Sequence, residues 1–448
     1  MNSTYDILII GGGPAGLVSA VTANRYYPDK KIALVKNINN GCIPCGIPYM
    51  FSSLKDPNEN KMGMAPLEKI GADVISKEAV SIDRAAKKVK LIDESEISYD
   101  KLILATGSDP LIPPIPGIDK KGIYPVYKDL DFLTSAIKDV KEGKHVVVIG
   151  GGFIGVEFAD EISQIDGMQV TLIEMMDQIL ANSFDPEFST MAEDKLVSKN
   201  IKVFTKSRVQ EIVGANKVEK VRLSSGEEIK ADSIILGVGA VPNTNLAIAA
   251  GLDIGKGKGI WVDEYMRTVD PDIFAVGDCA GKRDFYTRKD SPVLLASTAT
   301  AEARIAGANL YKLKVIRENK GTIAIYSTYV DGLVMGSAGL TEVRAQKENF
   351  EFVTGAAEAM DKHPGTLPGA HKVHVKLIFS KKSGIILGGQ VAGGKCCGEI
   401  INIIGLAIQQ RVSCTELETL QMATHPFVTA APTMYPIVKA AFDASGKM

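Results

Sequence analysis

Apolar runs that end at a glycine set the pattern of the first part of the chain. Residues 5–10 form such a run, and the segment from Leu17 to Arg25 is predicted to be a helix. A further apolar strand is expected at Ile32–Val35, and another ends at Thr106-Gly107. Continuous apolar runs are typical of strands buried on both faces, so this pattern predicts a parallel sheet with helices between its strands.

The same pattern starts again near residue 145. Residues 145–149 are an apolar strand, a helix follows, and Gln169–Ile173 is a further strand. After a strand at 233–236, the strand at 273–276 is expected to return to the first sheet, followed by an alanine-rich helix over 292–310. We therefore predict an α/β fold with two Rossmann-like nucleotide-binding domains.

From Thr322 onward the pattern changes to alternation. Apolar residues stand at every second position around Ile323 and again from Val373 to Leu377, which is typical of strands in an antiparallel sheet. The segment Glu399–Gln410 is predicted to be a helix. The last part of the chain is thus expected to be a third domain of α+β type, without a nucleotide fingerprint.

Each of the two nucleotide folds begins with a glycine-rich loop between a strand and a helix. In such loops the first glycine makes the tight turn, the second lets the backbone approach a pyrophosphate, and the third lets the helix pack on the strand. The helix N-terminus then presents free N–H groups to the phosphates. The candidate dinucleotide-binding residues are Gly11, Gly13, Pro14, Ala15 and Gly16 in the first loop, and Gly150, Gly152, Phe153, Ile154 and Gly155 in the second.

The residues at the strand ends differ between the two folds. The second fold has Glu174 at the end of its second strand, where a carboxylate can bond a ribose 2′-hydroxyl and would repel a 2′-phosphate. This favours NADH over NADPH. The first fold has Lys36 at the equivalent position, so either the backbone or Asn37 holds the ribose, or the lysine serves a phosphate. Asp278, at the end of the strand at 273–276, can bind a ribityl hydroxyl or form an Asx turn.

The stretch from Gly41 to Tyr49 is the candidate reactive site. It contains Cys42 and Cys45 in C-x-x-C spacing, with glycines that permit close backbone approach and prolines that stiffen the loop. The spacing suits a disulfide/dithiol pair with a lowered pKa. Half of a zinc site is the alternative, but the other candidate half, Cys396-Cys397, lacks that spacing, so we predict redox chemistry and no metal.

Composition narrows the class of protein. The chain has 448 residues, 45% hydrophobic and 23% charged, which predicts two or three globular domains. A net charge of −2 gives no indication of nucleic-acid or membrane-surface binding. Six cysteines in a chain of this length are not a disulfide scaffold. With neither a signal peptide nor a membrane span expected, we predict a cytoplasmic protein.

In their order, these motifs resemble the FAD-dependent pyridine nucleotide–disulfide oxidoreductases, over nearly the whole chain. The branch that it resembles holds NADH oxidase, NADH peroxidase, coenzyme A disulfide reductase and NAD(P)H polysulfide reductase. The resemblance implies an FAD-binding domain at 1–112 and 245–320, an NAD-binding domain at 113–244, and a C-terminal dimerisation domain at 321–448, hence a homodimer.

The resemblance also implies roles for single residues. The first glycine loop, Thr106, Gly107 and Asp278 would hold FAD, and the second loop, Glu157, Glu174 and Gly239 would hold NADH. Phe153 would be an aromatic gate over the flavin, and Cys45 the redox thiol beside it. Cys42 departs from the single-cysteine pattern of this branch and could form a disulfide with Cys45 or act as a resolving thiol.

Two residues of the C-terminal domain complete the candidate catalytic set. His425, in a His-Pro pair, resembles the histidine that reaches the partner's active site as acid–base in lipoamide and glutathione reductases. A structural His-Pro turn is the alternative. Tyr435 is a further candidate to face the partner's cysteine.

The predicted function is therefore electron transfer from NADH through FAD to a redox-active cysteine, and on to a disulfide, coenzyme A disulfide or polysulfide. An NADH oxidase or peroxidase that reduces O₂ or H₂O₂ through a cysteine sulfenic acid is the first alternative. An NADH:ferredoxin or rubredoxin reductase, in which Cys45 is dispensable, is the second. The third alternative is a flavin-bearing interaction protein, in which NADH binding controls association with a partner and does not lead to turnover.

Overall fold

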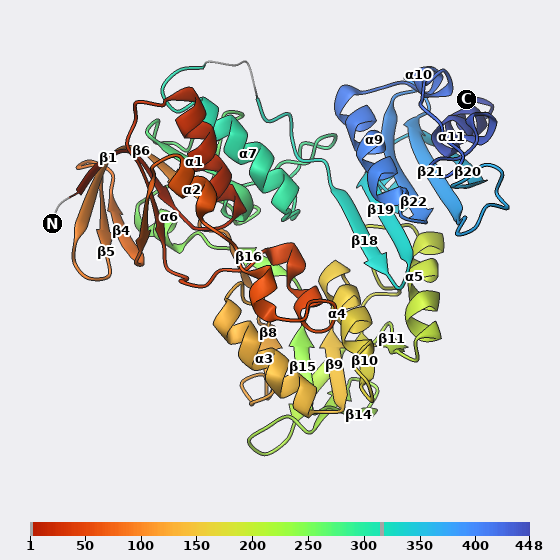
Figure 1. The fold of residues 1–448 in the computed structure, drawn as a ribbon, viewed down its shortest axis with the longest axis horizontal. Coiled ribbons are helices and arrows are strands. Elements are labelled where there is room, and N and C mark those ends of the chain that lie inside the picture. Colours follow the sequence, from red (N-terminus) through yellow and green to blue (C-terminus); the bar gives the residue numbers. More distant parts are fainter. Residues whose placement is uncertain (1–2, 314–317) are drawn as a thin grey trace.

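The structure is a computed structural model that describes residues 3–313 and 318–448. Figure 1 shows three units: the N-terminal unit with β1 and α1, a middle unit with β9 and α4, and a C-terminal unit with β21 and α9. The green and teal segments that follow the middle unit in sequence lie beside the red N-terminal segments. The chain therefore leaves the first unit, builds the second, and returns.

The first unit is built on a sheet whose inner strands are parallel. β1 (Ser3–Ile10) lies between β2 (Ile32–Lys36) and β6 (Glu96–Leu104), and β17 (Ile273–Ala275) pairs in parallel with β6 on the chain's return. The remaining elements of this unit are β3 (Asp73–Ser76), β4 (Ala79–Asp83), β5 (Lys88–Leu91), α1 (Pro14–Tyr26), α2 (Ala65–Lys69), α6 (Asn245–Ala249) and α7 (Ala296–Ala308). Helices α1 and α7 pack against each other beside the sheet (Figure 1).

The second unit repeats this plan. Its parallel sheet has the order β11-β10-β9-β15-β8, made from β8 (Ile123–Pro125), β9 (His145–Ile149), β10 (Gln169–Ile173), β11 (Lys202–Phe204) and β15 (Ser233–Leu236). Three helices accompany it: α3 (Leu130–Glu142), α4 (Phe153–Ser163) and α5 (Pro186–Ser198). A small antiparallel sheet joins β12 (Val209–Val213), β13 (Lys220–Leu223) and β14 (Glu228–Lys230).

The two crossings between these units pair with each other. β7 (Ser108–Pro110) leaves the first unit, β16 (Ala240–Pro242) returns to it, and the two form an antiparallel ladder. Thr106 Oγ1 also donates to the carbonyl of Asn243, at 2.7 Å. Because both connections are held together, the second unit is attached to the first by a two-stranded ribbon.

The third unit is an antiparallel sheet with helices. Its strand order is β18-β19-β22-β21-β20, and the alternating apolar residues of β21 lie in its core. The strands are β18 (Ile325–Val330), β19 (Leu333–Gly339), β20 (Phe352–Met360), β21 (Lys372–Ser380) and β22 (Ile386–Gly393). The helices are α8 (Glu342–Lys347), α9 (Cys397–Gln410), α10 (Cys414–Glu418) and α11 (Pro436–Ser445).

The predicted fold class is confirmed, with two parallel Rossmann-like sheets followed by an antiparallel α+β unit. Three helices differ in extent from the prediction. Helix α1 begins at Pro14 rather than Leu17, and α9 begins at Cys397 rather than Glu399. The helix expected from residue 292 begins at Ala296, because Leu295 is still extended, with φ −135°. Within the described residues, no helix is both long and apolar enough to cross a membrane.

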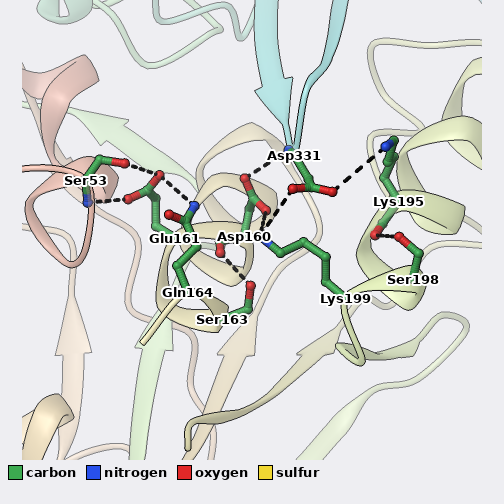
Figure 2. A network of polar contacts seen from close by, with 9 residues as sticks. All are labelled: Ser53, Asp160, Glu161, Ser163, Gln164, Lys195, Ser198, Lys199 and Asp331. Carbon is green, nitrogen blue, oxygen red and sulfur yellow. Dashed lines mark hydrogen bonds and ion pairs between the residues drawn. The ribbon is translucent and has the colours of Figure 1, made fainter. Parts of the chain in front are cut away.

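Helix α4 connects all three units through buried carboxylates (Figure 2). Glu161 accepts hydrogen bonds from the backbone N–H and the hydroxyl of Ser53, at 2.9 and 2.8 Å. Asp160 accepts from the backbone N–H of Asp331, in the β18–β19 turn, and pairs with Lys199 at 2.9 Å. Since Asp160 and Glu161 are both buried, these contacts fix the cysteine-bearing segment and the third unit to one helix.

Candidate functional site

One continuous cavity of about 2520 Å³ lies where the three units meet. Its walls come from both glycine loops, the cysteine stretch, the crossing strands and β18 of the third unit. The carboxyl ends of the strands in both parallel sheets face it, which is where doubly wound folds bind nucleotides. The predicted cofactor residues that line it are Gly11, Gly13, Pro14, Ala15, Lys36, Cys45, Thr106, Gly107, Gly150, Gly152, Phe153, Ile154, Glu157, Glu174, Gly239 and Asp278.

The two glycine loops have the same internal geometry. Gly11 and Gly150 have positive φ values of 123° and 107°. A Cβ on Gly16 would lie 1.9 Å from the Gly11 carbonyl oxygen, and one on Gly155 would lie 1.8 Å from that of Gly150. These two third glycines therefore serve the packing of helix on strand, as predicted, and neither lines the cavity.

The second glycine of each loop faces the cavity instead. A Cβ on Gly13 or Gly152 would meet no protein atom within 4 Å. Both stand directly before the first turns of α1 and α4, whose N–H groups are free for an anion. The chain thus leaves room beside each helix N-terminus where a dinucleotide pyrophosphate fits.

Glu174 and Lys36 stand at the ends of the second strands of the two folds, and both line the cavity. The Glu174 carboxylate accepts hydrogen bonds from the backbone N–H of Gly151, at 2.6 Å, and of Met176, at 2.7 Å, at the cavity wall. Lys36 donates to the carbonyl of Asn39, at 2.8 Å. Burial, and then the nearby charge of Lys61, lower the pKa of Lys36. The first fold therefore has cationic side chains where the second has a carboxylate.

Asp278 lies in a short 3₁₀ turn, Gly277–Cys279, directly after β17. Its Oδ2 atom accepts a hydrogen bond from the Ser108 hydroxyl, at 2.7 Å, and lies 3.4 Å from the Lys128 ammonium nitrogen. Beneath this turn, buried Glu302 accepts from the Gly277 N–H and pairs with buried Lys282, at 2.9 and 3.1 Å. The turn is thus fixed from below, and Asp278 faces the cavity.

The structure places two free thiols at the cysteine stretch, one buried and one exposed. Cys42 is packed in an apolar cluster, and its backbone forms a β-bridge with Lys61. Cys45 lies in the 3₁₀ turn Pro44–Gly46, and its side chain is exposed at the cavity. Both cysteines line the same cavity, so the sequence prediction that they act as a pair stays open.

Both thiols have raised pKa values, which contradicts the lowered pKa expected from the C-x-x-C spacing. Burial raises the pKa of Cys42 to about 11. Burial also raises the pKa of Cys45, and the carboxylates of Glu157 and Asp278 add to this effect, while Lys128 opposes it. Burial is the main cause of the raised pKa of Cys45, and the charges in the cavity modify it, so the cysteine spacing alone does not decide how acidic this thiol is.

Glu157 projects from α4 toward the same region. Its Oε1 atom accepts a hydrogen bond from the hydroxyl of Thr328, on β18, at 2.8 Å. Burial raises the pKa of Glu157 to about 7, and Glu161 and Asp160 contribute in the same direction. Near neutral pH this carboxyl group can therefore either hold or release a proton.

Phe153, the predicted aromatic gate, packs on the third unit. Its ring is stacked on that of Tyr326, with centroids 4.8 Å apart, and meets the edge of Phe184 at 6.0 Å. Phe153 and Tyr326 both line the cavity. The gate prediction itself stays a prediction.

His425 and Tyr435, the other two candidate catalytic residues, do not line the cavity of their own chain. His425 is exposed, and its Nδ1 atom accepts a hydrogen bond from the backbone N–H of Phe427, at 3.3 Å. Tyr435 is buried in the core of the third unit, and burial raises its pKa. Their action across a subunit interface remains a prediction.

Sequence reasoning missed Lys128, Thr328 and Tyr326, three cavity residues that contact predicted ones. Each comes from a segment with no motif, and each reaches the site only through the packing of separate units. Among the described residues, no group of three or more His, Cys, Asp or Glu side chains is arranged to hold a metal ion.

Comparison with known proteins identifies the class. Residues 5–303 match the family described as pyridine nucleotide-disulphide oxidoreductase, and residues 325–435 match the dimerisation domain of the same family. The chain belongs to the pyridine nucleotide-disulphide oxidoreductases. It is an NAD(P)H oxidoreductase of the disulfide/polysulfide reductase or NADH oxidase type, and its family binds FAD and NAD(P)H.

Individual relatives are similar over most of their length. An NADH oxidase of Methanocaldococcus jannaschii is 31% identical, over 98% of this chain and 99% of the relative. An NAD(P)H coenzyme A polysulfide/persulfide reductase of Pyrococcus horikoshii is 31% identical, over 88% of each chain. The solved structure of an NAD-dependent persulfide reductase from A. fulgidus has a TM-score of 0.91 and 32% identity, over 99% of this chain and 83% of that one.

Proposed function

We propose that this enzyme transfers two electrons from NADH, by way of FAD and Cys45, to a disulfide, coenzyme A disulfide or polysulfide. For a disulfide the balance is NADH + RSSR + H⁺ → NAD⁺ + 2 RSH. One observation carries the proposal: the exposed thiol of Cys45 lines the same cavity as both glycine loops, and each loop leaves open space at its second glycine. This arrangement supports a thiol as the last protein group before the acceptor.

In this proposal the first unit, 1–112 and 245–320, binds FAD, residues 113–244 bind NADH, and 321–448 form the dimer interface. The N-terminal end of α7 supports the FAD assignment, because Ala296 and Ala299 line the cavity and the helix dipole would favour an anionic flavin there. The chemistry that FAD supplies in such enzymes is the exchange of a hydride for an electron pair. The carboxylate of Glu174 at the second loop supports NADH over NADPH.

Water- or peroxide-forming oxidase chemistry is the second candidate, and one observation favours it. Cys42 is buried and free, so Cys45 is the exposed thiol of the stretch, as an enzyme with a single cysteine sulfenic acid requires. Relatives named NADH oxidase are as similar to this chain as the polysulfide reductases are.

An anaerobic titration of the purified flavoprotein with NADH tests the proposal. Starting from the oxidised protein, with Cys45 as a disulfide, persulfide or sulfenic acid, we expect four electrons per FAD in the wild type. We expect two in Cys45→Ser, in which only the flavin can be reduced. Two electrons in both proteins would remove the thiol from the mechanism.

Steady-state assays then separate the candidates. Cys45→Ser should retain reduction of the flavin by NADH but lose turnover with disulfide and polysulfide acceptors. Cys42→Ser should lose the same turnover if the two thiols act as a pair, and keep it if Cys45 cycles alone. Turnover with O₂ that exceeds turnover with every sulfur acceptor would favour the oxidase.

A further inference from the structure

Lys128 lines the cavity and is held there through both its backbone and its side chain. It directly precedes Asp129, whose side chain caps α3 by accepting from the N–H groups of Asp131 and Phe132. The backbone of Asp129 forms a β-bridge with Gly41, and the Leu130 N–H donates to the carbonyl of Asn40, at 2.9 Å. The backbone on the C-terminal side of Lys128 is therefore bonded to the chain that leads into the cysteine stretch.

The side chain of Lys128 is fixed on the opposite side, by the first unit. Its ammonium nitrogen lies 2.9 Å from the hydroxyl oxygen of Ser108, 3.3 Å from the Ser108 carbonyl oxygen and 3.4 Å from Asp278 Oδ2. About one third of the side chain is exposed, 35%, and the residue lines the cavity. The ammonium group of this long side chain is therefore held in place by Ser108 and Asp278.

The charges that act on Cys45 come from three different elements. Glu157 on α4 and Asp278 after β17 both disfavour the thiolate, and burial does so as well. The Lys128 ammonium acts in the opposite direction, on Cys45 and also on Cys42. Without this cation, the exposed thiol would face two carboxylates at the end of a partly desolvated cavity.

We propose that Lys128 is a positioning residue for the thiol of Cys45, with its Ser108- and Asp278-anchored ammonium group holding the thiolate in the cavity. This inference rests on the proposed function of Cys45 and adds to it the cation that favours the thiolate against burial and two carboxylates. The chemistry requires such a group, because the thiolate and not the thiol is the nucleophile.

The same cation also suits the exchange step. In that step the Cys45 thiolate attacks one sulfur atom of the acceptor, a new S–S bond forms, and the second acceptor sulfur leaves as a thiolate. One negative charge moves from the Cys45 sulfur to the leaving sulfur, and no electrons are gained or lost overall. A fixed ammonium group in the cavity that Cys45 lines favours this negative charge on either sulfur atom.

The test is the pH dependence of Cys45 alkylation in the FAD-loaded, reduced protein. Iodoacetamide labelling is followed at the Cys45 peptide by mass spectrometry between pH 6 and 10, so that the other cysteines do not contribute. In Lys128→Met we expect the curve to move up by about one pH unit, and the rate at pH 7.5 to fall about tenfold. Lys128→Arg, which keeps the charge, should retain the wild-type curve.

Two further variants make the result decisive. Lys128→Gln keeps a hydrogen-bond donor for Ser108 without the charge, and it should show the same shift if the methionine variant does not fold. Lys55→Met, on an exposed loop outside the cavity, should leave the curve unchanged. An unchanged curve in both uncharged Lys128 variants, or an equal shift in Lys55→Met, would overturn the proposal.

The outcome is separable from that of the proposed function. A shifted alkylation curve together with full acceptor turnover in Cys45→Ser would keep Lys128 as the positioning residue of a thiol that the reaction does not use. An unchanged curve together with a dead Cys45→Ser enzyme would keep the thiol mechanism and remove Lys128 from it.

Discussion

At the scale of single residues, Glu157 has two roles: its carboxyl group can carry a proton, and it also forms a contact between two units. It lies on α4 of the second unit, its carboxyl group acts on the pKa of Cys45, and it accepts a hydrogen bond from Thr328 of the third. Burial raises its pKa to about 7. A carboxyl group with this pKa can exchange protons with a neighbouring thiol near neutral pH, which an ordinary glutamate cannot do.

The raised pKa of Glu157 predicts a pH-dependent stability of definite sign. The folded protein holds a proton that the unfolded chain releases above about pH 4.5, so the contribution of this group is fully present below pH 4.5 and is lost as the pH rises through 7. Relative to Glu157→Gln, the wild type should lose on the order of 2 kcal/mol between pH 5 and 8. Urea unfolding of both proteins across this range measures the difference.

An infrared titration provides the direct control for that prediction. The absorption of a protonated carboxyl group should be present in the wild type at pH 6, decline with a midpoint near pH 7, and be missing from the difference spectrum of Glu157→Gln. A midpoint near 4.5 would mean that water reaches this carboxylate freely.

At the scale of elements, the two glycine loops separate packing from binding. In the first loop, Gly16 abuts the carbonyl of Gly11, whereas Gly13 faces open space in the cavity. Gly13 also has an ordinary φ of −80°, so its backbone tolerates a side chain. A side chain at Gly16 should therefore disturb the packing of the loop, whereas a side chain at Gly13 should disturb nucleotide binding.

Alanine substitutions in this loop should show that difference. Gly16→Ala should destabilise the protein by about 2 kcal/mol or more, because its Cβ meets backbone 1.9 Å away. Gly13→Ala should leave the stability of the FAD-free protein within about 0.5 kcal/mol, but weaken FAD binding at least about tenfold. Urea midpoints of the FAD-free proteins and flavin-fluorescence titrations measure the two effects. Equal FAD affinity in Gly13→Ala and the wild type would place the pyrophosphate elsewhere.

The elements that were predictable from sequence are those whose determinants are local. The glycine loops, the strands before them and the acidic end of β10 have short sequence motifs, and all were predicted. Lys128, Thr328 and Tyr326 were not, because their roles depend on the packing of units that are distant in sequence. The start of α7 was placed too early, since Pro292 and the residues after it follow the cavity wall instead of the helix.

At the scale of the whole molecule, a largely covered lysine joins the second and third units. Lys376 on β21 has its ammonium nitrogen 3.0 Å from Asp185, 2.6 Å from Glu187 and 2.6 Å from Glu342. Burial acts to lower the pKa of Lys376, but the hydrogen bonds to Glu187, Glu342 and Asp185 raise it above its usual value. Asp185 is itself buried and also bonds to Gln390, so one carboxylate of the cluster is shielded from water.

Removing this cation should loosen the third unit. Lys376→Met leaves a buried carboxylate unpaired and should lower the free energy of unfolding by about 3 kcal/mol. Lys372→Met, on the same strand, breaks an exposed ion pair with Glu358 and should leave the urea midpoint unchanged. Hydrogen exchange should rise in β18 and β21 of Lys376→Met alone. Equal midpoints for the two variants would show that the cluster adds nothing to the stability of the interface between units.

The largest-scale prediction concerns the assembly of two chains. Within one chain His425 does not line the cavity that holds Cys45, although the family provides a dimerisation domain over residues 325–435. If the histidine of one subunit serves the cysteine of the other, Cys45→Ser and His425→Ala homodimers should both be inactive with a sulfur acceptor. Their hybrid, however, contains one intact site, built from Cys45 of one chain and His425 of the other.

Refolding or co-expressing the two variants in equal amounts should therefore restore about one quarter of the wild-type activity, because half of the dimers are hybrids and each has one of its two sites intact. The control is a mixture of Cys45→Ser with the Cys45→Ser/His425→Ala double variant, which should stay inactive. Affinity tags prove that hybrids form. If hybrids form and no activity returns in the first mixture, His425 either acts on Cys45 of its own chain or has only a structural role in the His-Pro turn. Recovery would assign the exposed His-Pro turn to the active site of the partner, where the imidazole can protonate the leaving thiolate.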